Sequence, residues 1–127
     1  GRHNDAIDVL KPLLRYLQTS MKNIPPNRAQ IPMVAYNYAR ELEIVKRFDD
    51  AIDIGEYARR ICIDYGVYTV LPDILMILAE CHYHQGNHEK SAELYRQAYY
   101  IYKAMEDENN LAILRVEAKD FLGLELD

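Results

Sequence analysis

Residues 75–98 read LMILAECHYHQGNHEKSAELYRQA, and this stretch decides the fold. Its apolar residues recur every three or four positions, which is the period of a helix with one buried face. Gly86 and Asn87 interrupt the pattern at its middle, and a glycine there can take the left-handed conformation that ends a helix. The stretch therefore predicts two helices joined by a tight turn, and such a short connection makes them antiparallel.

The helical period extends over the whole chain and predicts six helices. They cover roughly residues 3–20, 29–45, 48–65, 70–85, 88–106 and 109–122. No long stretch alternates between apolar and polar residues as a strand does. The clearest break is the segment 23–27, with Pro25 and Pro26 at its centre, because it suits neither a helix nor a strand. Pro12 predicts that the first helix either kinks or begins at that residue.

Two kinds of helix alternate with a period near forty residues. One kind has the spacing three, four, three, which is found in His3, Ala6, Leu10 and Leu13, in Phe48, Ala51, Gly55 and Ala58, and in His88, Ser91, Tyr95 and Ala98. The other has the spacing four, three, which is found in Ala35, Ala39 and Leu42, in Leu75, Ala79 and His82, and in Leu114, Ala118 and Phe121. Small residues at these places allow two helices to approach closely. One pair cannot bury both of its faces, so we expect the pairs to stack into a helical solenoid.

These residues resemble the tetratricopeptide repeat. The residues that carry the resemblance are Leu78-Ala79, Gly86, His88, Ser91, Tyr95 and Ala98. Residues 39–58 look like a weaker second copy, with Lys46 at the turn glycine and Gly55 at the second aromatic position. The resemblance implies an all-α fold, a right-handed solenoid of antiparallel helix pairs that forms a single domain over residues 1–127. It divides the chain into the second helix of a truncated repeat (1–22), two repeats (29–66 and 70–106) and a C-terminal capping helix (109–123).

The chain departs from the family pattern in two respects. Neither copy has the proline that is usual at the end of the unit, and the period is longer than that of the family. The tail, from Ala98-Tyr99-Tyr100 to Phe121-Leu122, is similar to the carboxyl-terminal sensor domains of bacterial helix-turn-helix transcriptional regulators. In those proteins a DNA-binding domain precedes the repeats, which bind a peptide or form a homodimer. The resemblance implies a fragment of a longer protein, with no enzymatic activity and a peptide or protein segment as its partner.

Charge and composition exclude several classes of function. Of the 127 residues, 20 are acidic and 15 are basic, and the net charge of −5 disfavours direct nucleic-acid contact by this segment. The most apolar stretch, 70–79, is interrupted by Pro72 and Asp73 and is too short to span a membrane. No signal-peptide pattern opens the chain. Two cysteines are too few for a disulfide framework, so we expect a cytoplasmic protein.

The first helix of each pair lines the groove of such a solenoid. Aligning Ala39, Ala79 and Ala118 places the next residues, Arg40, Glu80 and Lys119, in register. The predicted groove residues are Met33, Tyr36, Arg40, Glu43, Met76, Glu80, Tyr83, His84, Arg115 and Lys119. Mixed charges together with tyrosine and methionine could hold an extended peptide. The alternative is a surface ladder of salt bridges, with Glu80 between two cations and little energy gained.

Metal binding and catalysis are disfavoured by the same spacing. Cys81, His82, His84 and His88 are close in sequence, but neighbours on a helix diverge by about a hundred degrees and cannot converge on one ion. No nucleophile paired with a base and no phosphate-binding loop is found, so we expect neither a catalytic site nor a cofactor. Cys62 and Cys81 are expected to be small buried hydrophobic residues.

An alternative function is a general interaction scaffold that acts through self-association. The cluster Tyr95, Tyr99, Tyr100 and Tyr102 motivates it, because tyrosine is enriched at protein interfaces. Tyr95 falls on the packing register and should belong to the core, so the other three tyrosines carry this hypothesis.

Overall fold

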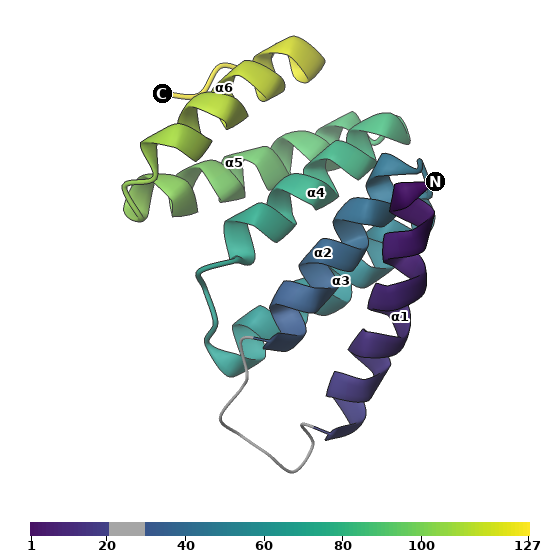
Figure 1. Ribbon diagram of the computed structural model, residues 1–127. Helices are drawn as coiled ribbons and strands as arrows, with labels where there is room; N and C mark the ends of the chain where they lie inside the picture. The colour runs from purple at the N-terminus through teal and green to yellow at the C-terminus, as the bar shows by residue number, and fades with distance from the viewer. Residues whose placement is uncertain (21–29) are drawn as a thin grey trace.

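The computed structural model describes residues 1–20 and 30–127, and all the regular structure in them is helical. The helices are α1 (Arg2–Ser20), α2 (Gln30–Ile44), α3 (Phe48–Tyr65), α4 (Leu71–His84), α5 (His88–Ala104) and α6 (Glu108–Leu122). They follow one another in space in chain order, from α1 at one edge of the molecule to α6 at the opposite edge (Figure 1). Each helix packs mainly on its neighbours in sequence, and the pair α4–α5 has the most extensive contact.

All six predicted helices are confirmed, with ends shifted by no more than a turn. The predicted break at 23–27 lies outside the described residues. Pro12 lies inside α1 rather than at its start, which excludes the alternative that the helix begins there. Its ring is tolerated on an exposed face of the helix, away from the core.

Left-handed residues produce the tight turns between helices. Gly86, with a φ of 83°, ends the α4 segment as predicted, and Gly66 and Gly123 follow α3 and α6 in the same way. Lys46 and Glu106 adopt this conformation without being glycine, with φ values of 65° and 58°. The turn geometry therefore recurs even where the sequence does not show a glycine.

The small residues of the repeat pattern lie in the seams between paired helices. Ala39 on α2 and Ala51 and Ala58 on α3 are buried, as predicted for a closely packed pair. The pair α4–α5 has the same arrangement and adds a polar link, because the Ser91 hydroxyl donates a hydrogen bond of 2.7 Å to the Ala79 carbonyl. One apolar core runs through all six helices.

Gly55 occupies a position where the repeat pattern has a large side chain. In α5 the corresponding residue is Tyr95, which is fully buried. In α3 the space is filled from the neighbouring helix instead, since a Cβ atom at Gly55 would lie 2.8 Å from Cδ2 of Leu78. The glycine is therefore a packing feature, and it explains why the second copy of the motif is weaker in sequence.

Within residues 1–20 and 30–127, no helix is long and apolar enough to cross a membrane.

Candidate functional site

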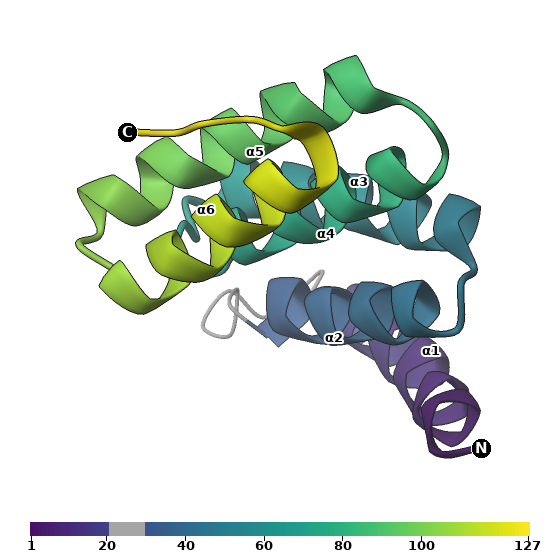
Figure 2. The ribbon, with the colours of Figure 1, turned by 90° about the horizontal axis from the view of Figure 1, so that it is seen from above.

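A cavity of about 480 Å³ opens beside α2 and α4, and it forms the candidate site. Its lining combines both charges with an aliphatic and two ring side chains: Arg40, Glu43, Ile44, Lys46, Phe48, Glu80 and His84. The first helices of successive pairs therefore supply most of the lining. Helix α6 continues this side of the molecule, where it lies alongside α5 and touches α4 (Figure 2).

Three glutamates from three helices converge at this site. Glu43 on α2, Glu80 on α4 and Glu117 on α6 follow one another at intervals of 37 residues. The Glu80 carboxyl is hydrogen-bonded to those of Glu43 and Glu117. Burial raises the pKa of Glu80 well above its usual range, and the two neighbouring carboxyls raise it further. Because adjacent carboxylates repel one another, Glu80 keeps its proton at neutral pH.

The outer two glutamates differ from Glu80 in their partners. Burial raises the pKa of Glu43 to about 7, although the hydrogen bond with Glu80 and the charge of Arg40 favour its carboxylate form. Glu117 accepts a hydrogen bond of 2.8 Å from the hydroxyl of the buried Tyr95. Glu80 is thus a protonated carboxyl with one O–H group, which it can donate to Glu43 or to Glu117 but not to both at once, and the group of three carries less negative charge than three glutamates would have in water.

A second polar group lies one helical turn from Glu43. Arg40 interacts with the Tyr36 hydroxyl and with the charge of Asp73. Burial raises the pKa of Asp73, and a hydrogen bond from Tyr102 opposes that effect. Arg40 is therefore the cation that balances the acidic side of α2 and α4.

Stacked rings border the glutamates. His84 stacks on Phe48, with ring centroids 4.9 Å apart, and Tyr83 stacks on Phe121 at 4.2 Å. Tyr83 also stacks on His88 at 5.2 Å. These contacts use the rings of His84 and His88 for packing.

The structure brings most of the predicted groove residues together. Six of them form the continuous surface just described: Tyr36, Arg40, Glu43, Glu80, Tyr83 and His84. Met76 lies half-buried on α4, and Met33 is exposed on α2.

Arg115 and Lys119 have other partners. Arg115 donates a hydrogen bond of 3.1 Å to the Tyr99 hydroxyl and lies over the ring of Tyr99. Lys119 forms an ion pair with Glu125 in the tail. Among the residues that the structure describes, Glu80 forms no ion pair with Arg40 or Lys119, so the alternative of a salt-bridge ladder around Glu80 is not supported.

Sequence reasoning missed Glu117 and Phe121, which α6 contributes to this surface. The signal that could have found them is the regular interval of 37 residues, which also separates the left-handed residues Gly86 and Gly123. Alignment on the small residues Ala79 and Ala118 gave an interval of 39 and placed Lys119 beside Glu80 instead.

The cysteines and the histidine cluster behave as packing residues. Cys62 and Cys81 are both buried and free. Burial raises the pKa of the Cys62 thiol to about 11 and also raises that of Cys81. Burial lowers the pKa of His82, which lies half-buried. Among the described residues, no group of three or more His, Cys, Asp and Glu side chains is arranged to hold a metal ion.

The tyrosine cluster is mostly internal. Tyr95 is fully buried, as expected, but so are Tyr99 and Tyr102, and only Tyr100 is exposed. Two of the three tyrosines behind the self-association hypothesis are therefore unable to contact a partner.

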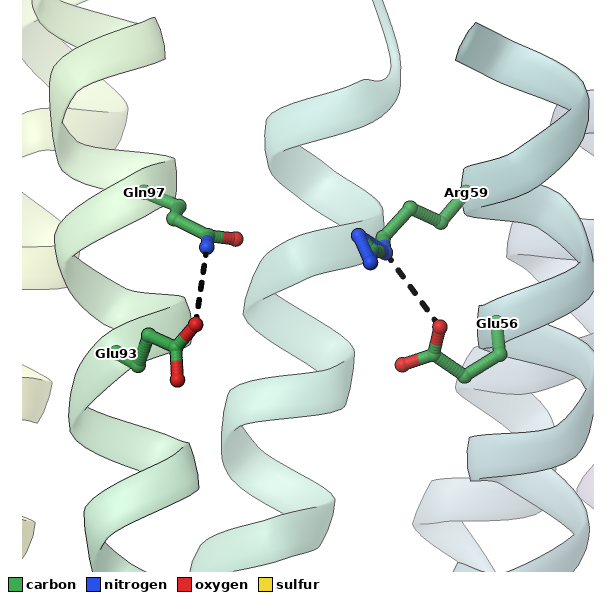
Figure 3. Close-up of polar contacts among 4 residues, drawn as sticks. All are labelled: Glu56, Arg59, Glu93 and Gln97. Atoms are coloured by element: carbon green, nitrogen blue, oxygen red, sulfur yellow. Dashed lines mark hydrogen bonds and ion pairs between the residues drawn. The ribbon is translucent and has the colours of Figure 1, made fainter. Parts of the chain in front are cut away.

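A second hollow lies on the other side of the molecule, between α3 and α5 over α4. Its mainly apolar lining is formed by Arg59, Ile63, Leu71, Leu75, Gln97, Tyr100 and Ile101. Figure 3 shows its polar edge, where Arg59 interacts with Glu56 on α3 and Gln97 donates to Glu93 on α5. Both contacts measure 3.4 Å and stay within one helix, so neither of them bridges the hollow.

No protein-family model, curated protein sequence or solved structure matches this chain.

Proposed function

We propose that this chain is a non-catalytic module that binds an extended peptide or protein segment carrying a basic side chain. The observation that carries the proposal is the convergence of Glu43, Glu80 and Glu117 beside a cavity with stacked rings. The basic side chain would lie against these carboxyls. Arg40 and Lys46, which line the same cavity, would contact backbone carbonyls or a carboxylate of the same segment.

The family-level part of the proposal rests on the repeat pattern. Sequential packing of helix pairs, small residues in the seams and left-handed turn residues all support a tetratricopeptide-like right-handed solenoid. We further propose that it serves as the sensor or dimerisation domain of a bacterial transcriptional regulator, as the resemblance of the tail implies. The division into a truncated repeat, two repeats and a capping helix belongs to the same proposal.

A basic ligand suits this site because its positive charge would offset the repulsion among the three neighbouring carboxyls. A lysine or arginine side chain would replace the shared proton of Glu80 as the partner of the neighbouring carboxylates, and charge-assisted hydrogen bonds would form. The rings of Phe48 and His84 would pack on the aliphatic stem of the same side chain. Binding would then release a proton, so affinity should increase as the pH rises above neutral.

Calorimetric titration with two short peptides tests this proposal. The peptides have the same apolar flanks and differ only at a central residue, which is lysine in one and norleucine in the other. We expect the lysine peptide to bind more tightly than the norleucine peptide. Glu43→Gln or Glu80→Gln should weaken binding of the lysine peptide about tenfold, which corresponds to the loss of one charge-assisted hydrogen bond. Arg40→Ala should weaken both peptides equally if Arg40 contacts the backbone.

Lys119→Ala and Glu93→Gln are the matched controls, because both residues are exposed and lie outside the cavity. They should leave the affinity of the lysine peptide unchanged. Equal affinity for the two peptides, or equal losses in the control and the groove variants, would remove the glutamates from the binding site.

A further inference from the structure

The hollow between α3 and α5 continues into a second hollow, and together they form an apolar trough. The first has a volume of about 350 Å³, and the second, beside the end of α5, has a volume of about 530 Å³. Leu71, Tyr100 and Ile101 line both hollows, which makes them continuous. Helices α3, α4 and α5 each pack on a helix at either side, so the trough lies in the middle of the helix series.

Large apolar and aromatic side chains remain exposed along the trough. Tyr100 is 66% exposed and Ile63 is 51% exposed. Tyr68 and Met105, at the end of the trough beside the end of α5, are exposed as well. Tyr100 is the exposed member of the tyrosine cluster. Contiguous apolar surface of this kind is typical of a binding site.

A single cation lies at the other end of the trough. Among the described residues that line the two hollows, Arg59 is the one with a charge. Its side chain extends from α3 over α4, and Gln97 extends toward it from α5 (Figure 3). Glu56 contacts Arg59 through Nε at 3.4 Å, and such a partly exposed pair is weak. The terminal N–H groups of the guanidinium are not part of this contact, and their fork matches the geometry of a carboxylate.

The length of the trough limits what it can hold. From Gln97 to Met105 the α5 wall advances by about 12 Å, at a rise of 1.5 Å per residue. That distance is only about two turns of a docked partner helix, whereas protein helices average about three to four turns. A saturated chain of ten carbons has nearly the length of the trough, because each bond of about 1.5 Å advances the chain by about 1.25 Å. The trough therefore fits one extended alkyl chain better than a protein helix.

We propose that this trough binds a medium-chain fatty acid, with the carboxylate on Arg59 and the alkyl chain along Leu71, Tyr100 and Ile101. The carboxylate would accept two hydrogen bonds from the terminal N–H groups of the guanidinium, in place of the weak contact with Glu56. The alkyl chain would cover apolar surface that is otherwise in contact with water. The trough shares no lining residue with the candidate groove, so this binding is separate from the proposed peptide binding.

NMR titration of the isotope-labelled 127-residue chain with sodium decanoate, below its critical micelle concentration, tests the proposal. The methyl signals of Leu71, Leu75 and Ile101 should shift and saturate with a Kd of about 0.1–1 mM, the range expected for a ligand of this size. Hexanoate has the same carboxylate and a shorter chain. It should bind at least about tenfold more weakly, because it covers less apolar surface.

Two substitutions at the polar end of the trough should act in opposite directions. Arg59→Gln removes the cation and should weaken decanoate binding about tenfold, which corresponds to the loss of a charge-assisted hydrogen bond. Glu56→Gln removes the competing carboxylate and should strengthen decanoate binding by up to about fivefold, the range of a surface ion pair. Arg60→Gln is the matched control and should leave the Kd unchanged, because Arg60 is exposed on the same helix and lines neither hollow. Circular dichroism verifies that each variant is folded.

Three results would overturn the proposal. The first is the absence of a saturable shift in the methyl signals of the trough, and the second is equal affinity of Arg59→Gln and Arg60→Gln for decanoate. The third is a larger shift at Ile44, which lines the candidate groove, than at the trough residues. A trough that serves a partner protein would give the first or the second result. If Arg59→Gln does not fold, Glu56→Gln decides, and unchanged or weaker binding by that variant overturns the proposal.

Discussion

The shared proton at Glu80 predicts that the protein loses stability as the pH rises above neutral. Glu80 is held between the carboxyls of Glu43 and Glu117, and its pKa is raised by burial first and by these neighbours second. In the unfolded chain the same carboxyl has an ordinary pKa near about 4.3 and is ionised at neutral pH. Folding at neutral pH therefore takes up a proton at this site.

A raised pKa in the folded state makes stability greatest at low pH. The contribution is fully present below the unfolded pKa and is lost as the pH rises toward the folded pKa. One proton held only in the folded state lowers the free energy of unfolding by about 1.4 kcal/mol for each pH unit, so about 2 kcal/mol is lost between about pH 7 and pH 8.5. The lowered pKa of His82 has the opposite effect, and it acts on the acid side of this range.

Glu80→Gln isolates this contribution. The amide keeps the size and the hydrogen-bond donor of the protonated carboxyl but cannot ionise. The variant should therefore be more stable than the unchanged protein at pH 8.5, and its free energy of unfolding should fall with pH less than half as steeply. Urea unfolding followed by circular dichroism at a series of pH values gives both quantities. Glu93→Gln, which changes an exposed carboxylate on α5, is the control, and its free energy of unfolding should fall with pH as steeply as that of the unchanged protein. An identical slope in Glu80→Gln, or an unchanged protein whose stability does not fall with pH, would contradict the protonated state of Glu80.

Three further predictions concern packing. Ala79→Phe places a ring in the fully buried seam between α4 and α5 and should cost about 1–3 kcal/mol, measured as a lower melting temperature; an unchanged melting temperature would show that the seam lies elsewhere. Gly55→Leu adds a side chain where even a Cβ would lie 2.8 Å from Leu78, and a loss of about 1–3 kcal/mol in urea unfolding is expected, whereas Leu78→Ala in the same chain should recover part of it. Cys62 and Cys81 should react slowly with iodoacetamide in the folded protein and quickly in urea, because burial raises the pKa of both thiols; fast labelling of the folded protein would argue against their burial.

The local patterns of the sequence were enough to predict the helices and their pairing. Apolar residues at helical spacing and the turn at Gly86 mark the elements, since both depend on backbone geometry within a few residues. Ala39 and Ala79 identified the seams because only small side chains allow backbones so close. The left-handed Lys46 and Glu106 show the weakness of such signals, because a non-glycine residue can occupy a turn that tertiary packing holds in place.

The candidate site was predicted in part. Tyr36, Arg40, Glu43 and Glu80 come from α2 and α4, whose register the small residues give correctly. The register of α6 was predicted wrongly, because Ala118 was aligned with Ala79. Helix α6 packs mainly on α5, so its buried residues, including Ala118, indicate only where it contacts that helix. The spacing of residues within α6 does not determine how far α6 is displaced along α4, because α5 lies between these two helices in the chain.

The sequence by itself determined that this protein is all-helical, where its turns lie and which residues form the seams of its helix pairs, because these properties follow from helical periodicity and from side-chain volume. Only the tertiary structure decided that Glu43, Glu80 and Glu117 meet, that Leu78 fills the space at Gly55, and that Arg59 lies at the end of an apolar trough. Each of these depends on how one helix is displaced along the next. That displacement is determined by the packing of many side chains at once, so no single motif records it.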